Sequence, residues 1–190
     1  DVVSFTGSTR VGREIAVKVG QRLGRVSLEL GGKNPLVVCE DADLVKAASW
    51  VCLSAFSNAG QRCAAGSRII IFDAVYEQFK AMLIESAAAL KVGTGDDCDL
   101  GPVINERQLN CMLAAVEAAR ANDAQVLTGG ERLTGAEHLG GYYMAPTLVE
   151  SVAAEDAMST TELFGPIATL YRVKDFSEAL ELANHSPYGL

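Results

Sequence analysis

The apolar positions of the chain follow two different periods in alternating segments. Apolar residues that recur every three to four positions predict amphipathic helices, and short runs rich in valine, isoleucine and aromatic residues predict strands. The helical period covers residues 10–22, 44–56, 74–91, 106–121 and 176–183. The strand pattern covers residues 2–5, 26–30, 36–39, 67–72, 125–128, 142–149 and 167–173. Because strands alternate with helices throughout, the chain is predicted to form an α/β sheet with helices on both faces.

The composition is that of a folded globular chain. Of the 190 residues, 49% are hydrophobic and 21% are charged, and the formal net charge is −8. A disordered tail would be less hydrophobic, and no apolar run reaches the roughly 18 residues that a membrane-spanning helix requires. Nucleic acids and anionic membrane surfaces attract basic faces, so the negative charge predicts neither of them as a partner.

The five cysteines predict free thiols. Their number is odd, they form no Cys-x-x-Cys pair, and only two histidines accompany them. Disulfide frameworks and zinc sites are recognised by paired spacings that this chain lacks. The pattern therefore predicts a reducing, cytoplasmic location and no bound metal ion.

Cys63 is the candidate nucleophile among these cysteines. It lies in a loop of mostly small residues, 60–66, that leaves the sulfur accessible. Arg62 and Arg68 are expected to favour the thiolate, which is the form that attacks. Spacing by itself favours a simpler interpretation, a loop cysteine without a role. A further alternative, a cysteine hydrolase or acyltransferase, requires His138 within hydrogen-bond reach of the sulfur.

Two other positions next to predicted strands carry candidate chemistry. Glu29 is the one acid in an otherwise apolar strand that ends at a Gly-Gly pair, and it is a candidate general base. The turn 6–9 lies between a strand and a helix, where free main-chain N–H groups attract phosphate. Taken singly, an outward-facing strand residue and an ordinary capped turn explain these positions at least as well.

Taken together, these segments resemble the aldehyde dehydrogenase superfamily. The match rests on four motifs in the family's order and at close to its spacings. They are Phe5-Thr6-Gly7-Ser8-Thr9, Leu28-Glu29-Leu30-Gly31-Gly32-Lys33-Asn34-Pro35, Gly60-Gln61-Arg62-Cys63 and Glu162-Leu163-Phe164-Gly165-Pro166. The resemblance runs from the first residue to the last, and it implies an open, mostly parallel α/β sheet with helices on both faces.

The resemblance implies a role for each matching position. Cys63 matches the nucleophile, which attacks an aldehyde to give a thiohemiacetal; its hydride passes to a nicotinamide, and a thioester remains. Glu29 matches the general base that activates water to hydrolyse the thioester to a carboxylic acid. The main-chain N–H of Cys63 would be one oxyanion donor. NAD or NADP is the implied cofactor, bound by Gly7 and Ser8 at the pyrophosphate, Leu30 and Gly31 near the nicotinamide, and Glu162 and Phe164 at the nicotinamide ribose.

The resemblance also implies that the chain is part of a longer enzyme. Residues 1–31 match the end of an NAD(P)-binding domain, and residues 32–190 match a catalytic domain that is truncated at its C-terminal end. The matching segments leave out the upstream half, which holds a side-chain oxyanion donor and the groups that grip the adenine ribose. The expected partners are a small aldehyde and, in the complete protein, further copies in a homodimer or homotetramer. The isolated piece is expected to be inactive.

Overall fold

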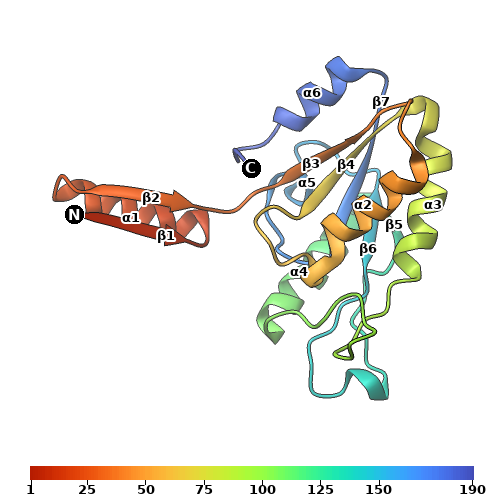
Figure 1. The fold of residues 1–190 in the computed structure, drawn as a ribbon, viewed down its shortest axis with the longest axis horizontal. Helices are drawn as coiled ribbons and strands as arrows, with labels where there is room; N and C mark the ends of the chain where they lie inside the picture. The colour runs from red at the N-terminus through yellow and green to blue at the C-terminus, as the bar shows by residue number, and fades with distance from the viewer.

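The computed structural model describes residues 1–190 and contains two separate β-sheets (Figure 1). The smaller sheet has two parallel strands, β1 (Val2–Thr6) and β2 (Arg25–Glu29), which are joined through α1 (Thr9–Gln21). The larger sheet has the strand order β3-β4-β7-β6-β5. Its strands are β3 (Asn34–Val38), β4 (Gly66–Phe72), β5 (Gln125–Thr128), β6 (Thr147–Glu150) and β7 (Ile167–Val173).

The larger sheet is mostly parallel. The pairs β3–β4, β4–β7 and β6–β7 are parallel, and only β5 at the edge is antiparallel to its neighbour. Parallel neighbours need long connections, and helices provide them here. The helices are α2 (Leu44–Phe56), α3 (Tyr76–Ala88), α4 (Glu106–Ala121), α5 (Ala157–Thr160) and α6 (Phe176–Asn184).

Helices cover both faces of this sheet, as the sequence predicts. Successive strand residues point to opposite faces. In β4, Ile69 and Ile71 therefore enter a core with α2 and α3, whereas Ile70 packs towards Ala179 of α6. The helices α4 and α5 contribute to a further core that includes Met112 and lies against β6 and β7. The predicted fold class is thus confirmed. None of the helices combines the length and the apolar character needed to span a membrane.

Three elements differ most from the sequence prediction, whereas the bounds of the other predicted helices and strands shift by at most two residues. The strand predicted for 142–149 begins only at Thr147, since Pro146 just before it has no N–H to donate to a ladder. The helix predicted for 74–91 is shorter, because its first residues form a 3₁₀ turn, Asp73–Val75, and α3 ends at Ala88. The four-residue helix α5 was not predicted, because one turn is too short to show a period.

The β1-α1-β2 unit stands apart from the larger sheet and is joined to it by residues 30–33 (Figure 1). The C-terminal residue returns to this connection, where a Cβ built on Gly32 would lie 2.9 Å from Cβ of Leu190. The predicted boundary between residues 31 and 32 falls in the connection. That residues 1–31 belong to a cofactor-binding domain stays a prediction.

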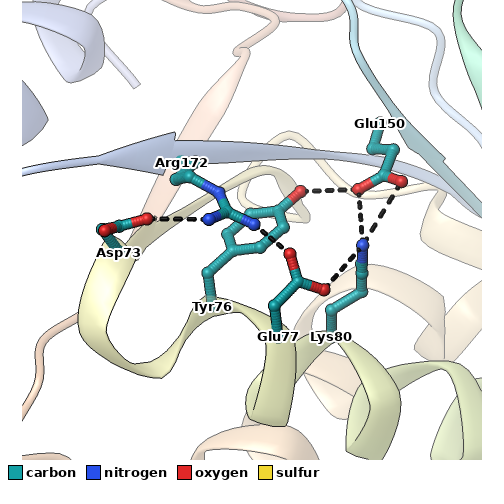
Figure 2. Close-up of polar contacts among 6 residues, drawn as sticks. All are labelled: Asp73, Tyr76, Glu77, Lys80, Glu150 and Arg172. Carbon is teal, nitrogen blue, oxygen red and sulfur yellow. Dashed lines mark hydrogen bonds and ion pairs between the residues drawn. The ribbon is translucent and has the colours of Figure 1, made fainter.

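A cluster of polar side chains ties α3 to β6 and β7 (Figure 2). Its members are Asp73, Tyr76, Glu77, Lys80, Glu150 and Arg172. The Tyr76 hydroxyl and the Lys80 ammonium both donate to Oε2 of Glu150, at 2.8 Å and 3.2 Å. The Arg172 guanidinium stacks 4.2 Å from the centre of the Tyr76 ring. Every charged member has an oppositely charged partner, so the cluster acts as a bridge between elements.

Candidate active site

A cavity of about 720 Å³ opens between the smaller sheet and the larger one. Its lining comes from the carboxyl ends of β1 and β2, the loop before β4, the start of α4 and the segment before β7. The lining residues are Thr6, Gly7, Ser8, Glu29, Leu30, Gly31, Gln61, Arg62, Cys63, Ala64, Gln108, Glu162 and Phe164. All the catalytic and cofactor-binding residues predicted from the sequence line this one cavity. Their chemical roles stay predictions.

Cys63 is exposed at this cavity and follows a strained turn. The residues Asn58, Ala59 and Gly60 have φ values of 54°, 52° and 65°, all in the left-handed region. That conformation costs about 1–2 kcal/mol for each residue with a side chain. Hydrogen bonds across the turn offset the cost, since Gln61 N–H donates to the Asn58 carbonyl at 3.1 Å. Such strain is typical of segments that position functional groups.

Gln61 anchors the same turn to a distant loop. Its Oε1 accepts from Ile104 N–H at 2.8 Å, and its Nε2 donates to the Pro102 carbonyl at 3.2 Å. The side chain therefore satisfies main-chain groups on another segment and fixes the residue two positions before Cys63. Sequence reasoning did not single out Gln61, because its partners are more than 40 positions away.

The two arginines expected to favour the Cys63 thiolate are held elsewhere. The Arg62 guanidinium donates to the carbonyls of Leu53 and Ser54 in the last turn of α2, both at 3.1 Å. Arg68 is buried and donates to Lys33 O at 2.9 Å and to carbonyls at the end of α6. Both side chains thus bond to carbonyls at helix ends and not to the sulfur, and the expectation that their charges favour the thiolate stays a prediction.

The carboxyl ends of β1 and β2 bring Glu29 beside the turn at Gly7 and Ser8. The strands pair in parallel with Thr6 opposite Glu29, and Gly7 N–H donates to the Glu29 carbonyl at 3.0 Å. Ser8 caps α1, because its side chain accepts from Val11 N–H. The first main-chain N–H groups of α1 have no helical acceptors, and with the helix dipole they suit an anionic group.

Glu162 reaches the junction between the two sheets. Its Oε1 accepts from Gly32 N–H at 3.3 Å. Partial burial raises the pKa of the Glu162 carboxyl, while that N–H and the Lys33 ammonium act in the opposite direction. Burial lowers the pKa of Lys33 to about 8, with Arg68 adding to the effect and Glu162 opposing it. Lys33 and Glu162 therefore favour each other's charged form.

Phe164 lines the cavity and has a left-handed main-chain conformation, with φ of 53°. The Gln108 side chain of α4 donates to Leu163 O at 2.7 Å and so holds the neighbouring peptide. Gly165 lies against the left-handed turn, because a Cβ on Gly60 would be 2.1 Å from Gly165 O. Gln108 was also missed, and its one signal was a place in the first turn of a predicted helix.

His138 does not approach the cysteine. Its Nε2 lies 3.0 Å from Val92 O, and its ring packs 4.9 Å from that of Tyr143. It is absent from the cavity lining. The geometry contradicts the alternative of a cysteine hydrolase that pairs Cys63 with His138.

Comparison with family models and curated proteins gives a consistent result. The model described as "Aldehyde dehydrogenase family" matches residues 1–190. An alpha-ketoglutaric semialdehyde dehydrogenase from Bacillus subtilis (strain 168) is 37% identical over all of this chain and 39% of its own length. A 3,6-anhydro-alpha-L-galactose dehydrogenase from Vibrio sp. (strain EJY3) is 40% identical over all of this chain and 40% of its own length. The chain thus spans about two fifths of the relatives it matches.

Solved structures give the same picture. A betaine aldehyde dehydrogenase from Staphylococcus aureus in complex with NAD+ superposes with a TM-score of 0.97 and 33% identity. All of this chain and 38% of that one are covered. A 3,6-anhydro-L-galactose dehydrogenase in complex with NADP superposes with a TM-score of 0.96 and 38% identity. The match covers all of this chain and 40% of the other. The backbone geometry is therefore shared along the full chain.

Proposed function

The chain belongs to the aldehyde dehydrogenase family, and we propose that the protein carrying it oxidises an aldehyde to a carboxylic acid with NAD or NADP. One observation carries the proposal. Cys63, in the loop before β4, and Glu29, at the end of β2, line the same cavity together with the turn before α1 and Glu162. A nucleophile, a base and groups suited to a cofactor are then within one space. A small aldehyde as substrate, a homodimer or homotetramer as the assembly and a cytoplasmic location belong to the same proposal.

The cavity residues fit the pyrophosphate and the nicotinamide part of a dinucleotide. A volume of about 720 Å³ lies in the range of small-molecule sites. Gly7 and Ser8, at the start of α1, would hold the pyrophosphate, and the Glu162 carboxylate would accept from ribose hydroxyls. Leu30 packs against α1 at Gly12 and borders the space from the side of the smaller sheet. When bound, the cofactor supplies a nicotinamide that accepts a hydride.

Cys63 supports the first half of the reaction. Its thiolate attacks the aldehyde carbon, the C–S bond forms, and the carbonyl oxygen becomes an oxyanion. The main-chain N–H of Cys63 is a donor of the kind that stabilises this charge. Loss of the hydride re-forms the carbonyl and leaves a thioester on the sulfur. The exposure of Cys63 at the cavity agrees with a group that must meet a substrate.

Glu29 supports the second half. The carboxylate takes a proton from a water molecule, the resulting hydroxide attacks the thioester carbon, and the C–S bond breaks. The products are a carboxylic acid and the regenerated thiolate. Glu29 ends β2 with its side chain exposed and lines the same cavity as Cys63, which supports a base that acts on the acyl carbon through one water.

Two substitutions in the complete protein test the roles of Cys63 as nucleophile and Glu29 as general base. Cys63→Ala should abolish formation of NADH or NADPH with any aldehyde, since no thiohemiacetal can form. Glu29→Gln should keep a burst of reduced cofactor, close to one equivalent per site, and then stall because the thioester persists. Stopped-flow absorbance measures the burst, and mass spectrometry of the stalled protein detects the acyl group on Cys63.

Matched controls are available outside the cavity. Cys111→Ala removes another exposed cysteine, and Glu85→Gln neutralises an exposed acid on α3. Both variants should turn over like the unmodified protein. Normal turnover in Cys63→Ala or in Glu29→Gln would overturn the proposed mechanism.

A further inference from the structure

Asn34, the first residue of β3, extends its side chain to the Cys63 loop. Its Nδ2 donates to Cys63 O at 2.6 Å and to Ala65 O at 2.9 Å. Both partners are carbonyl oxygens, which only accept hydrogen bonds, so the NH₂ end of the carboxamide is the end that fits here. One side chain thus holds two carbonyls of the loop that carries the thiol.

The ladder between β3 and β4 is irregular at Asn34. Asn34 pairs with Gly66, but the next residue, Pro35, pairs with Arg68, so the ladder skips Ser67. The extra residue lies in β4, and such an irregularity bends the strand that carries it, here directly after the Cys63 loop. Pro35 also confines Asn34 to extended conformations. The Asn34 main chain is therefore confined where its side chain meets the Cys63 loop.

Gly32 leaves room for the same contact. A Cβ on Gly32 would lie 2.8 Å from Cys63 O and 2.8 Å from Oδ1 of Asn34. Real Cβ atoms essentially never come so close to another heavy atom. The Cys63 carbonyl is thus enclosed between the main chain at Gly32 and the Asn34 amide.

Both peptide planes on either side of Cys63 are consequently fixed. The preceding plane is held by a turn, in which Arg62 O accepts from Ala65 N–H at 3.1 Å. The following plane is held from outside the loop by Asn34. Fixing both planes sets the main-chain dihedrals of Cys63, and with them the directions of its Cα–Cβ bond and its N–H.

We infer that Asn34 is a positioning residue. It holds the Cys63 carbonyl so that the thiol and the Cys63 main-chain N–H both point to the same substrate carbonyl group. The inference rests on the proposed function and deepens it. Attack on a carbonyl needs both groups, because an oxyanion forms as the C–S bond forms. Alkylation of the thiol at a saturated carbon needs the sulfur alone.

Two chemical probes separate these cases. With 4-nitrophenyl acetate, Sγ of Cys63 attacks the ester carbonyl, the acetyl group is transferred to sulfur, and 4-nitrophenolate leaves with the bonding electrons. With iodoacetamide, Sγ displaces iodide from a CH₂ carbon and no oxyanion forms. Peptide mass spectrometry assigns each modification to Cys63 among the five cysteines. Rates are measured on the complete protein.

Asn34→Ala removes the two donors, and Asn34→Asp keeps the shape of the side chain while facing the carbonyls with acceptors. Both should slow acetylation about 10- to 100-fold, since misplacing a reacting group or an oxyanion donor has effects of this order or larger. Alkylation should stay within about threefold. Asn122→Ala, which removes an exposed Asn–Asp156 hydrogen bond on the far end of α4, should change neither rate.

Three results would overturn the inference. Unchanged acetylation in both Asn34 variants would show that the carboxamide does not orient Cys63. An equal loss with both probes, or loss of the native circular dichroism spectrum in both variants, would show that Asn34 only supports the fold. Alkylation without acetylation in the unmodified protein would instead contradict Cys63 as an acyl-accepting nucleophile, and the proposed function would fail with it.

Discussion

The Glu162 carboxylate lies directly against the main chain of Gly31. A Cβ built on Gly31 would be 2.0 Å from Oε2 of Glu162, and the next residue, Gly32, donates its N–H to Oε1 at 3.3 Å. The carboxylate is therefore oriented by the backbone that joins the two sheets. A side chain at position 31 would occupy the place of the carboxylate.

Gly31→Ala should weaken cofactor binding with little effect on folding. The added methyl group meets the end of a flexible side chain, so Glu162 can turn away at small cost. Its bond to Gly32 is then lost, and we expect the Kd for NAD or NADP to rise about tenfold, which corresponds to about 1.4 kcal/mol. Calorimetric titration of the complete protein measures this change.

A second glycine provides the control for this substitution. Gly20 lies in α1, and no atom lies within 4 Å of the place that an added methyl group would take. Gly20→Ala should therefore leave the Kd unchanged and stabilise the helix by up to about 1 kcal/mol. An unchanged Kd in Gly31→Ala would contradict a role of Glu162 in holding the cofactor.

Gly60→Ala should destabilise the fold itself. Gly60 has φ of 65°, and a Cβ there would lie 2.1 Å from Gly165 O and 2.9 Å from Ala55 O, which are main-chain atoms that cannot swing aside. The left-handed conformation alone costs about 1–2 kcal/mol for alanine, and the clash adds to it. We expect the free energy of unfolding, measured in urea, to fall by about 3 kcal/mol.

Gly140→Ala separates the two contributions to that loss. Gly140 also has a positive φ, 84°, but nothing lies within 4 Å of the added carbon. Its loss of stability should therefore stay at about 1 kcal/mol. Equal losses at both positions would show that the approach of Gly60 to Gly165 relaxes without cost.

Sequence patterns predicted the elements whose period was long and regular. The predicted bounds of α2 and α4 coincide with those observed, because each spans several helical turns. The bounds of the short strands β5 and β7 also coincide, because turn-forming residues flank them, Gly129-Gly130 after β5 and Gly165-Pro166 before β7. Failures fell where the period is interrupted or too short. Pro146 removes a ladder donor from the predicted strand, and α5 is a single turn.

The sequence predicted the candidate nucleophile and base that line the cavity, but not the residues that hold the loop around them. Motif resemblance placed Cys63 and Glu29, whereas Asn34 and Gln61 act through hydrogen bonds to main-chain atoms 29 or more positions away. No local pattern carries that information. Arg62 shows the converse case, since it is a neighbour of Cys63 in sequence, yet its long side chain bonds to carbonyls in the last turn of α2.

The buried Lys33 predicts a specific dependence of stability on pH. Its pKa is lowered from 10.5 to about 8 in the folded protein. Between these values the unfolded chain binds a proton that the folded protein has released, so raising the pH favours the folded state. From about pH 7.5 to about pH 9.5, the unmodified protein should gain about 2 kcal/mol relative to Lys33→Met.

Urea denaturation of both proteins at several pH values measures that difference. Other titrating groups, including the buried Cys52, whose pKa burial raises to about 11, are present in both proteins and cancel in the comparison. Parallel stability curves for the two proteins would show that Lys33 titrates at its ordinary pKa.

We expect the two donors to the Glu150 carboxylate to contribute unequally to the free energy of unfolding (Figure 2). The Glu150 side chain is 13% exposed and that of Lys80 is 20% exposed. Water can therefore hydrate either charge only partly when its partner is removed. Lys80→Met leaves a nearly buried negative charge with one neutral donor, and it should lower the free energy of unfolding by about 2–3 kcal/mol. Tyr76→Phe removes the neutral donor and keeps the ion pair, so it should cost about 1 kcal/mol.

A double-mutant cycle assigns the larger loss to the charge. In a Glu150→Gln background the residue is neutral, and Lys80→Met should then cost less than in the unmodified protein by about 1 kcal/mol or more, the coupling energy of a contacting pair. Lys91→Met is the exposed control, because Lys91 and Asp97 form a solvated pair at 3.2 Å that contributes about 0.5 kcal/mol or less. If Lys80→Met lowered stability as little as Lys91→Met does, the contact between α3 and β6 would not depend on its ion pair. The same would follow if Glu150→Gln left the effect of Lys80→Met unchanged.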